Sequence, residues 1–172
     1  MDRQQIGLKL ALDTLGLPFS LATFDDRLIL QKAASIIQTA GVELGYHFHW
    51  YLRGPYSSSL TRDAFAVAAE LGEGRDESNG CRLDETSQQR LQRLRGLFDE
   101  QDRHSLASKL ELLGSVLYLL RHRQIAGSDV AELRRILFAY GKDFSEAEIN
   151  AGLEELNEYG LCEIGQPREA NC

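Results

Sequence analysis

The fold is decided by the stretch Tyr51-Leu52-Arg53-Gly54-Pro55-Tyr56-Ser57-Ser58-Ser59-Leu60, which joins an aromatic segment to an amphipathic one. Glycine adopts backbone conformations that other residues avoid, and proline fixes its own φ, so the Gly-Pro pair predicts a tight turn. Either Ser57 or Ser58 can cap the helix that we expect to follow. Because the connection is short, it fixes the directions of its tyrosine and arginine side chains.

Outward from this stretch, the spacing of apolar residues predicts mostly helices. The aromatic, alternating segment 46–52 predicts a strand, and short strands are also expected at 81–83 and 161–164. Helical spacing of apolar residues predicts helices over about 6–15, 26–41, 60–71, 85–101, 106–120, 130–140 and 146–159. Asp25 or Asp26 is expected to cap the second helix, and Ser105 the helix at 106–120. Ser128 or Asp129 is expected to cap the helix at 130–140, and Ser145 the helix at 146–159.

The segment 106–120 carries leucines on two faces, so we expect a central helix that is buried almost all round. The chain is therefore predicted to be mainly α with a small β component, folded as one compact, two-lobed unit. Residues 1–84 would form a helix-strand-helix lobe that contains the Gly-Pro turn. Residues 85–164 would form a helical lobe with a helix-turn-helix-like pair, followed by a flexible tail over 165–172.

Composition favours a cytoplasmic protein. The chain has 172 residues, of which 43% are hydrophobic, enough for one domain or for two small lobes that share a core. No apolar stretch approaches the length of a membrane span, and the start of the chain lacks the pattern of a secretion signal. The cysteines Cys81, Cys162 and Cys172 form an odd, widely spaced set, which is typical of reduced thiols.

The net charge is −7, but its distribution is uneven. Residues 86–123 carry 7 basic and 4 acidic side chains, whereas the segments on either side are acidic. An acidic protein needs a local basic patch to bind nucleic acid. The patch predicted here consists of Arg90, Arg93, Arg95, Arg121 and Arg123, and the alternative is that these arginines form an ordinary solvated face.

The helix-turn-helix-like pair itself is a poor candidate for DNA recognition. Recognition helices carry Arg, Lys, Asn or Gln toward the major groove. The helix expected at 146–159 instead carries five glutamates and neither lysine nor arginine, so phosphate would repel it. We therefore interpret the pair as a packing unit or a protein-contact unit.

The residues that could carry chemistry form no complete constellation in the sequence. His47 and His49 would share one face of a strand, but a metal site needs three or four ligands. Cys81 follows a polar loop and could act as a nucleophile, yet the sequence places no histidine beside it. No nucleotide-binding glycine pattern and no Gly-x-Ser-x-Gly elbow is present. We predict no metal and no cofactor, and keep an enzyme site near these three residues as an alternative.

The chain resembles a family of small bacterial and archaeal winged-helix-like proteins with the signature Tyr-x-x-Gly-Pro-Tyr-Ser-x-x-Leu. The resemblance spans about residues 24–164, and a more distant likeness links the chain to antitoxin-associated domains that continue differently after Gly-Pro. The resemblance implies a winged-helix-like fold and no particular chemistry. The matching residues are Leu30-Gln31-Lys32, Gly45-Tyr46, Phe48, Tyr51, Gly54, Pro55, Tyr56, Ser57, Leu60, Leu110-Glu111, Tyr118-Leu119, Ser145, Ile149, Leu156 and Gly160-Leu161.

The surface around the Gly-Pro turn is the strongest candidate for function. Tyrosine and arginine dominate contact energies at protein interfaces, and the turn region offers Tyr51, Arg53, Tyr56 and Arg62. The alternative for Arg53 is a structural ion pair with an acid such as Asp63. We therefore predict a non-enzymatic interaction or regulatory protein that contacts a partner protein, or a second copy of itself, through this surface. DNA binding through the basic patch is the alternative function.

Overall fold

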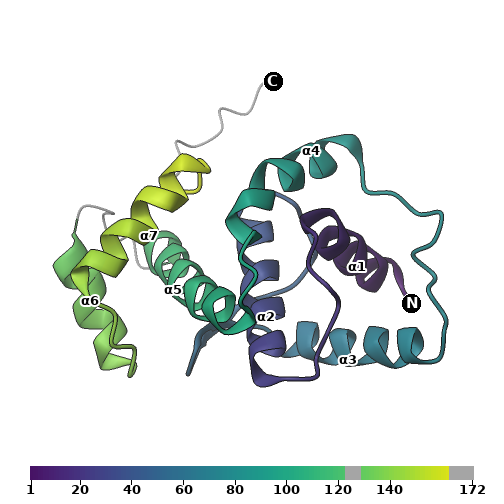
Figure 1. The fold of residues 1–172 in the computed structure, drawn as a ribbon, viewed down its shortest axis with the longest axis horizontal. Coiled ribbons are helices and arrows are strands. Elements are labelled where there is room, and N and C mark those ends of the chain that lie inside the picture. Colours follow the sequence, from purple (N-terminus) through teal and green to yellow (C-terminus); the bar gives the residue numbers. More distant parts are fainter. Residues whose placement is uncertain (123–128, 163–172) are drawn as a thin grey trace.

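The computed structural model describes residues 1–122 and 129–162, and these are mainly helical with one small sheet (Figure 1), as predicted. The predicted tail, and Ser128 as a cap, lie outside the described residues. In chain order the elements are α1 (Arg3–Leu15), α2 (Phe24–Thr39), β1 (His49–Tyr51), β2 (Gly54–Tyr56), α3 (Ser58–Gly72), α4 (Glu85–Leu94), the 3₁₀ helix η1 (Arg95–Phe98), α5 (Arg103–His122), α6 (Val130–Ala139) and α7 (Glu146–Glu158).

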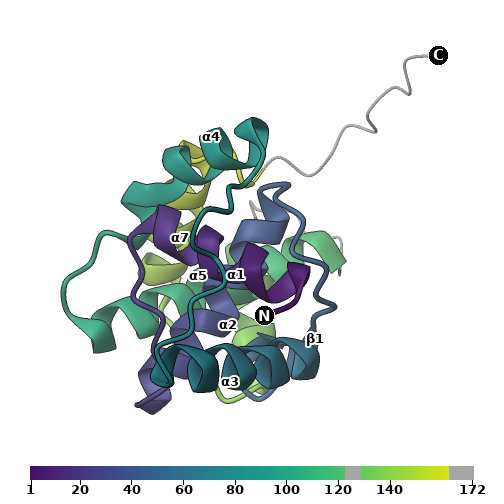
Figure 2. The ribbon, with the colours of Figure 1, turned by 90° about the vertical axis from the view of Figure 1, so that its right-hand side faces the viewer.

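Helices α2 and α5 pack side by side and form the centre of the molecule (Figure 1). On one side α1 contacts α2, α3 and α4, and on the other α5 contacts α6 and α7. Figure 2 shows α1 in front of this central pair, with α3 below it. Since α4 follows the predicted lobe boundary at residue 84 and yet packs against α1, the two parts of the chain share one core.

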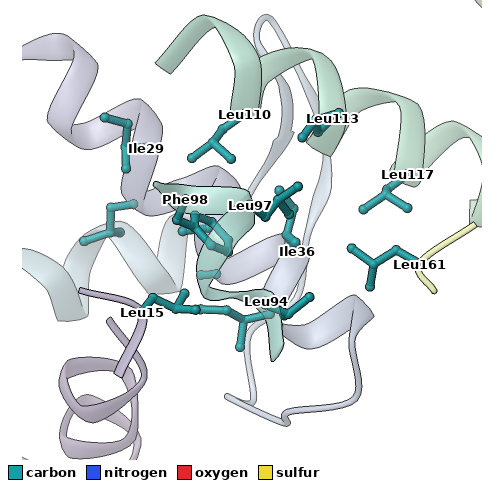
Figure 3. Packing of buried hydrophobic residues seen from close by; sticks show 14 of the residues in the cluster. Leu15, Ile29, Ile36, Leu94, Leu97, Phe98, Leu110, Leu113, Leu117 and Leu161 are labelled. Atoms are coloured by element: carbon teal, nitrogen blue, oxygen red, sulfur yellow. The ribbon is translucent and has the colours of Figure 1, made fainter. Parts of the chain in front are cut away.

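The core explains why the leucine-rich helix is central. Leu106, Leu110, Leu113 and Leu117 are buried on one side of α5, and Leu112, Val116 and Leu119 are buried on the other, which confirms the prediction. Figure 3 shows Leu110 close to Leu97 and Phe98 of η1, and Leu117 close to Leu161. Burial of each such side chain contributes about 1.5–3 kcal/mol, so α5 contributes strongly to the stability of the single core.

Helix caps account for most differences between the expected and the observed helix starts. Thr23, rather than Asp25 or Asp26, caps α2: its side chain accepts a hydrogen bond from the Asp26 backbone at 3.1 Å. The Asp26 side chain in turn accepts a hydrogen bond from the Thr23 N–H. Asp26, which was predicted as a cap, is therefore the third residue of the helix and the second partner of a capping box. Ser57 caps α3, Asp129 caps α6 and Ser145 caps α7, as expected, and Asp2 and Asp84 cap α1 and α4. In contrast, α5 starts at Arg103, so Ser105 lies inside it.

The β-component is a hairpin, and its turn differs from the prediction. Leu52 and Arg53 form the turn, while Gly54 and Pro55 belong to β2, with Tyr51 opposite Gly54 and His49 opposite Tyr56. Gly54 has a φ of 82°, and a Cβ there would clash with Oγ of Ser115 on α5. The glycine is therefore required by both its backbone conformation and its contact with α5.

The strands are shorter than predicted. The first covers 49–51 rather than 46–52, and residues 81–83 and 161–162 have no strand structure; residues 163–164 lie outside the described range. Strands persist only where a neighbour accepts and donates backbone hydrogen bonds. Within residues 1–122 and 129–162, β1 and β2 pair only with each other.

Candidate functional site

A groove with a volume of about 590 Å³ lies between α2, the hairpin and the start of α3. We call it the hairpin groove. Its lining is mostly apolar, as is usual for binding sites. The residues that line it are Leu21, Phe24, Arg27, Leu28, Leu30, Gln31, Lys32, Tyr51, Leu52, Arg53, Gly54, Tyr56, Thr61 and Phe65.

Large apolar side chains stand exposed around the hairpin groove. Phe24, Tyr51, Leu52 and Phe65 are each between 53% and 72% exposed. They are four of the six exposed large hydrophobic side chains in the part of the chain that the structure describes. An apolar patch of this kind, gathered around one hollow, is typical of a surface that another molecule covers.

The alternation of the hairpin places its residues on two sides. Trp50 packs its ring against Tyr118 and Tyr140, at centroid distances of 5.6 and 4.9 Å. The next residue, Tyr51, faces the groove, where its ring lies 5.5 Å from that of Tyr56. One side of the hairpin thus packs against aromatic side chains of the helical part, and the other side faces the groove.

Two glutamines of α2 fix the backbone on either side of the hairpin. The Gln31 side chain donates to the Ser57 carbonyl and accepts from the Ser57 N–H, both at 2.9 Å. Gln38, two turns further along α2, makes the same pair of bonds to Tyr46, both at 2.8 Å. Because each side chain satisfies one donor and one acceptor, the hairpin is held against α2 at both of its ends.

Lys32 is the most unusual residue of the groove. It is only 1% exposed, and its Nζ donates a hydrogen bond of 2.7 Å to the carbonyl of Pro55. Burial, together with the positive charges of Lys142 and Arg53, lowers the pKa of Lys32 from 10.5 to about 7, and the negative charge of Glu111 opposes this shift. A lysine this perturbed in a groove is a candidate functional residue.

The charged residues beside Lys32 do not balance. Glu111 of α5 is buried and accepts hydrogen bonds from the buried Lys142 and from Arg53, whose Nη1 lies 3.3 Å from Oε2. Burial lowers the pKa of Lys142 as well, although its bond to Glu111 opposes this. One carboxylate thus accepts hydrogen bonds from two basic side chains, Lys142 and Arg53, and acts electrostatically on a third, Lys32, so basic groups outnumber acidic ones in this cluster.

Arg53 pairs with a different acid from the one proposed as its structural partner. It contacts Glu111, whereas Asp63 accepts hydrogen bonds from Tyr46 and Arg62. The Arg53 guanidinium also lies 5.8 Å from the centre of the Phe24 ring, a distance at which cations and aromatic faces attract each other. Its side chain nevertheless remains 61% exposed and can contact a ligand.

The structure brings together three of the four residues predicted to contact a partner. Tyr51, Arg53 and Tyr56 line the hairpin groove, while Arg62 lies on α3 outside its lining. The sequence analysis missed the rim residues Phe24, Leu52 and Phe65, and it missed Lys32 as a site residue. A signal for Lys32 existed, because a lysine among the apolar residues 28–37 of a core helix must be paired or have an altered pKa.

The residues of the alternative enzyme site lie apart from the hairpin groove. His47 and His49 are both exposed, and His47 lines a separate hollow with Arg121 and His122 that includes neither His49 nor Cys81. Cys81 is exposed and its thiol contacts the Glu77 carbonyl at 3.7 Å. Among the described residues no group of three or more His, Cys, Asp or Glu side chains is placed to hold a metal ion.

The described residues of the predicted nucleic-acid patch come from α4, η1 and α5. Arg90 donates to the carbonyl of Gly41, whereas Arg93 and Arg95 of α4 and η1 are exposed. Arg121 is exposed near the end of α5, and Arg123 lies outside the described residues. DNA binding through this patch stays a prediction.

Comparison with protein-family models, with curated proteins and with solved structures found no significant match. No helix in residues 1–122 or 129–162 is long and apolar enough to cross a membrane. The fold and the site together define a mainly helical protein with a packed hairpin and an apolar groove.

Proposed function

We propose that this chain is a non-enzymatic cytoplasmic interaction protein that binds a partner protein through the hairpin groove. The observation that carries the proposal is the ring of exposed apolar side chains around a hollow with a buried lysine. Solvent exposure of such a ring is unfavourable, and covering it would contribute about 25 cal/mol per Å² of apolar area. Arg62 would contact the same partner from the neighbouring turn of α3.

The architecture supports this proposal in a second way. The hairpin is held by Gln31 and Gln38 on one side and by the aromatic packing of Trp50 on the other. A pre-ordered surface loses little conformational entropy on binding. We propose that the fold is winged-helix-like, with the hairpin as the wing, and that this wing serves protein contact.

A pull-down from cells that naturally produce the protein tests the proposal. Tagged wild-type chain is compared with Arg53→Glu and Leu52→Glu, which place negative charge on the groove's exposed edge, and with Tyr56→Ala. The matched control is Arg93→Glu, which makes the same charge change on α4. We expect the groove variants to lose at least one partner that wild type and the control retain.

Thermal melts of the same preparations separate binding from folding. Leu52 and Arg53 are exposed, so their variants should melt close to wild type. Tyr56→Ala removes a half-buried ring and the acceptor of a 3.0 Å hydrogen bond from Thr61, so it can also destabilise the fold. Its loss of binding is evidence for the groove only if its melting temperature equals that of wild type. Retention of every partner by all folded groove variants would reject the hairpin groove as the docking surface. Light scattering shows whether the partner is a second copy of the chain.

DNA binding is the second candidate function, and the exposed Arg93 and Arg95 are the observation in its favour. It predicts salt-dependent binding to duplex DNA that is lost in Arg90→Glu with Arg93→Glu. Because Arg90 also bonds the Gly41 carbonyl, Arg93→Glu with Arg95→Glu is the cleaner pair. Absence of binding at low salt would rule this function out.

A further inference from the structure

We infer that the partner segment seated in the hairpin groove is an acidic one, which places a carboxylate beside Arg53 and Lys32 and aromatic or aliphatic side chains against the groove rim. The inference rests on the proposed function and names the chemistry of the partner. It does not follow from an exposed apolar patch alone.

The charge of the groove is the first argument. Its described lining includes three basic side chains, Arg27, Lys32 and Arg53, and no acidic one. The chain as a whole carries a net charge of −7, so this is a local reversal of sign. A segment with a negative charge is attracted here, and a basic segment is repelled.

The unequal pairing beneath the groove is the second argument. Glu111 is shared between Lys142 and Arg53, and Lys32 is within the electrostatic reach of all three. Among the described residues Nζ of Lys32 makes one hydrogen bond, to Pro55, although an ammonium group can donate three. A carboxylate from outside would supply the negative charge that this cluster lacks.

The geometry also lets the carboxylate and the apolar side chains bind together. Arg53 is exposed and sits over the Phe24 ring, so its guanidinium can turn from Glu111 toward a ligand while its stem stays on the rim. Phe24, Leu52 and Phe65 lie around the same hollow. Arginine and carboxylate can form two parallel hydrogen bonds, which gives such a contact its specificity.

Binding of a carboxylate should be coupled to proton uptake. The pKa of Lys32 is lowered to about 7 by burial and by Lys142 and Arg53, with Glu111 opposing. A new negative charge nearby raises this pKa, so at pH 8 Lys32 takes up a proton as the ligand binds. A contact made only by apolar side chains would not produce this effect.

The first part of the test is a selection of random peptides displayed on phage against the immobilised full-length chain. An excess of the Arg53→Glu chain in solution competes for phage that bind outside the groove and removes them. We expect the recovered peptides to combine Asp or Glu with aromatic or aliphatic residues. The best peptide is then compared by calorimetry with its copy in which Asn or Gln replaces the acid. We expect the amide copy to bind about ten-fold more weakly.

The variants connect this preference to the groove. Arg53→Gln should reduce the ten-fold difference to about two-fold or less, while Arg93→Gln, the same change on α4, should leave it intact. Calorimetry at pH 8 in buffers of different ionisation enthalpy should show proton uptake with the acidic peptide. Lys32→Met should abolish that uptake; if this variant does not fold, Arg53→Gln alone decides.

Three results would overturn the inference. The first is a selection that recovers only peptides without acidic residues, and the second is equal binding of the acidic peptide and its amide copy. The third is a selection that recovers no peptide while the fatty acid dodecanoate binds the chain, which would assign the groove to a small molecule. Groove-binding peptides without acidic preference would leave the proposed function standing. If every folded groove variant retained all partners in the pull-down, the proposed function itself would be rejected.

Discussion

Gly54 is the residue on which the hairpin depends most. Its φ of 82° suits glycine, and a side chain there would meet Oγ of Ser115. Gly54→Val should therefore destabilise the protein by more than the about 1–3 kcal/mol that backbone strain alone costs. Arg53→Ala should cost within about 1 kcal/mol, because the Arg53 side chain is mostly exposed and the buried Glu111 keeps its bond to Lys142. Thermal melts compare the two; an equal loss for Arg53→Ala would show that Arg53 is structural and not a binding residue.

Ser115 provides a complementary test at the same contact. Its Oγ is buried and has no hydrogen-bond partner among the described residues, so removing it costs no hydrogen bond. We expect Ser115→Ala to be neutral or to stabilise the protein slightly, by up to about 1 kcal/mol. It should also reduce the damage caused by Gly54→Ala when the two are combined. Urea unfolding of the single and double variants measures both effects; additive losses would contradict the clash between the two positions.

Lys32 should make stability depend on pH. Its pKa is lowered in the folded protein from 10.5 to about 7, so between these values the unfolded chain holds a proton that the folded protein has released. Raising the pH through this window therefore favours folding, by up to about 1.4 kcal/mol per pH unit, while below about pH 7 this contribution does not change. Lys32→Met should remove the rise between pH 7 and 9. Urea unfolding across that range measures it, and identical slopes for both proteins would contradict the account.

At the scale of elements, α2 determines how the hairpin is held. Gln31→Leu leaves the buried N–H of Ser57 without its acceptor, which costs about 1–3 kcal/mol, while the Ser57 carbonyl keeps its bonds from Thr61. We expect it to destabilise the protein more than Gln38→Leu, because the bonds of Gln38 to Tyr46 are only partly buried. Chemical denaturation ranks the two variants. A larger effect at Gln38 would show that the upstream segment, not the start of α3, anchors the hairpin.

Elements with a strong periodic pattern could be predicted from the sequence, whereas the turn and the strand register of the hairpin could not. The leucines of 106–120 repeat on two faces, and only a helix buried all round accommodates them. The stretch 51–60 was recognised, but its turn lies at Leu52-Arg53 because β2 pairs with β1 through Gly54 and Pro55. Nothing local marks that register; it depends on the approach of Gly54 to α5.

The candidate site shows the same division at the scale of the whole molecule. Tyr51, Arg53 and Tyr56 were predictable because they lie in one short segment. Phe24 and Phe65 come from different helices, and only the packing of α2, α3 and the hairpin brings them to the same groove. The link between Lys32, Glu111 and Lys142 likewise joins residues distant in the chain. Sequence spacing carries no information on such contacts.

The central claim is that a partner protein occupies the hairpin groove, and site-specific photo-crosslinking in living cells tests it most directly. The photoreactive p-benzoylphenylalanine replaces Leu52 at the tip of the hairpin or, as a control, Phe138, an exposed aromatic residue on α6. We predict that the probe at position 52 crosslinks one defined protein, that Arg53→Glu in the same chain abolishes this product, and that the probe at position 138 does not form it. The same product from both positions, or no product from position 52, would contradict the account.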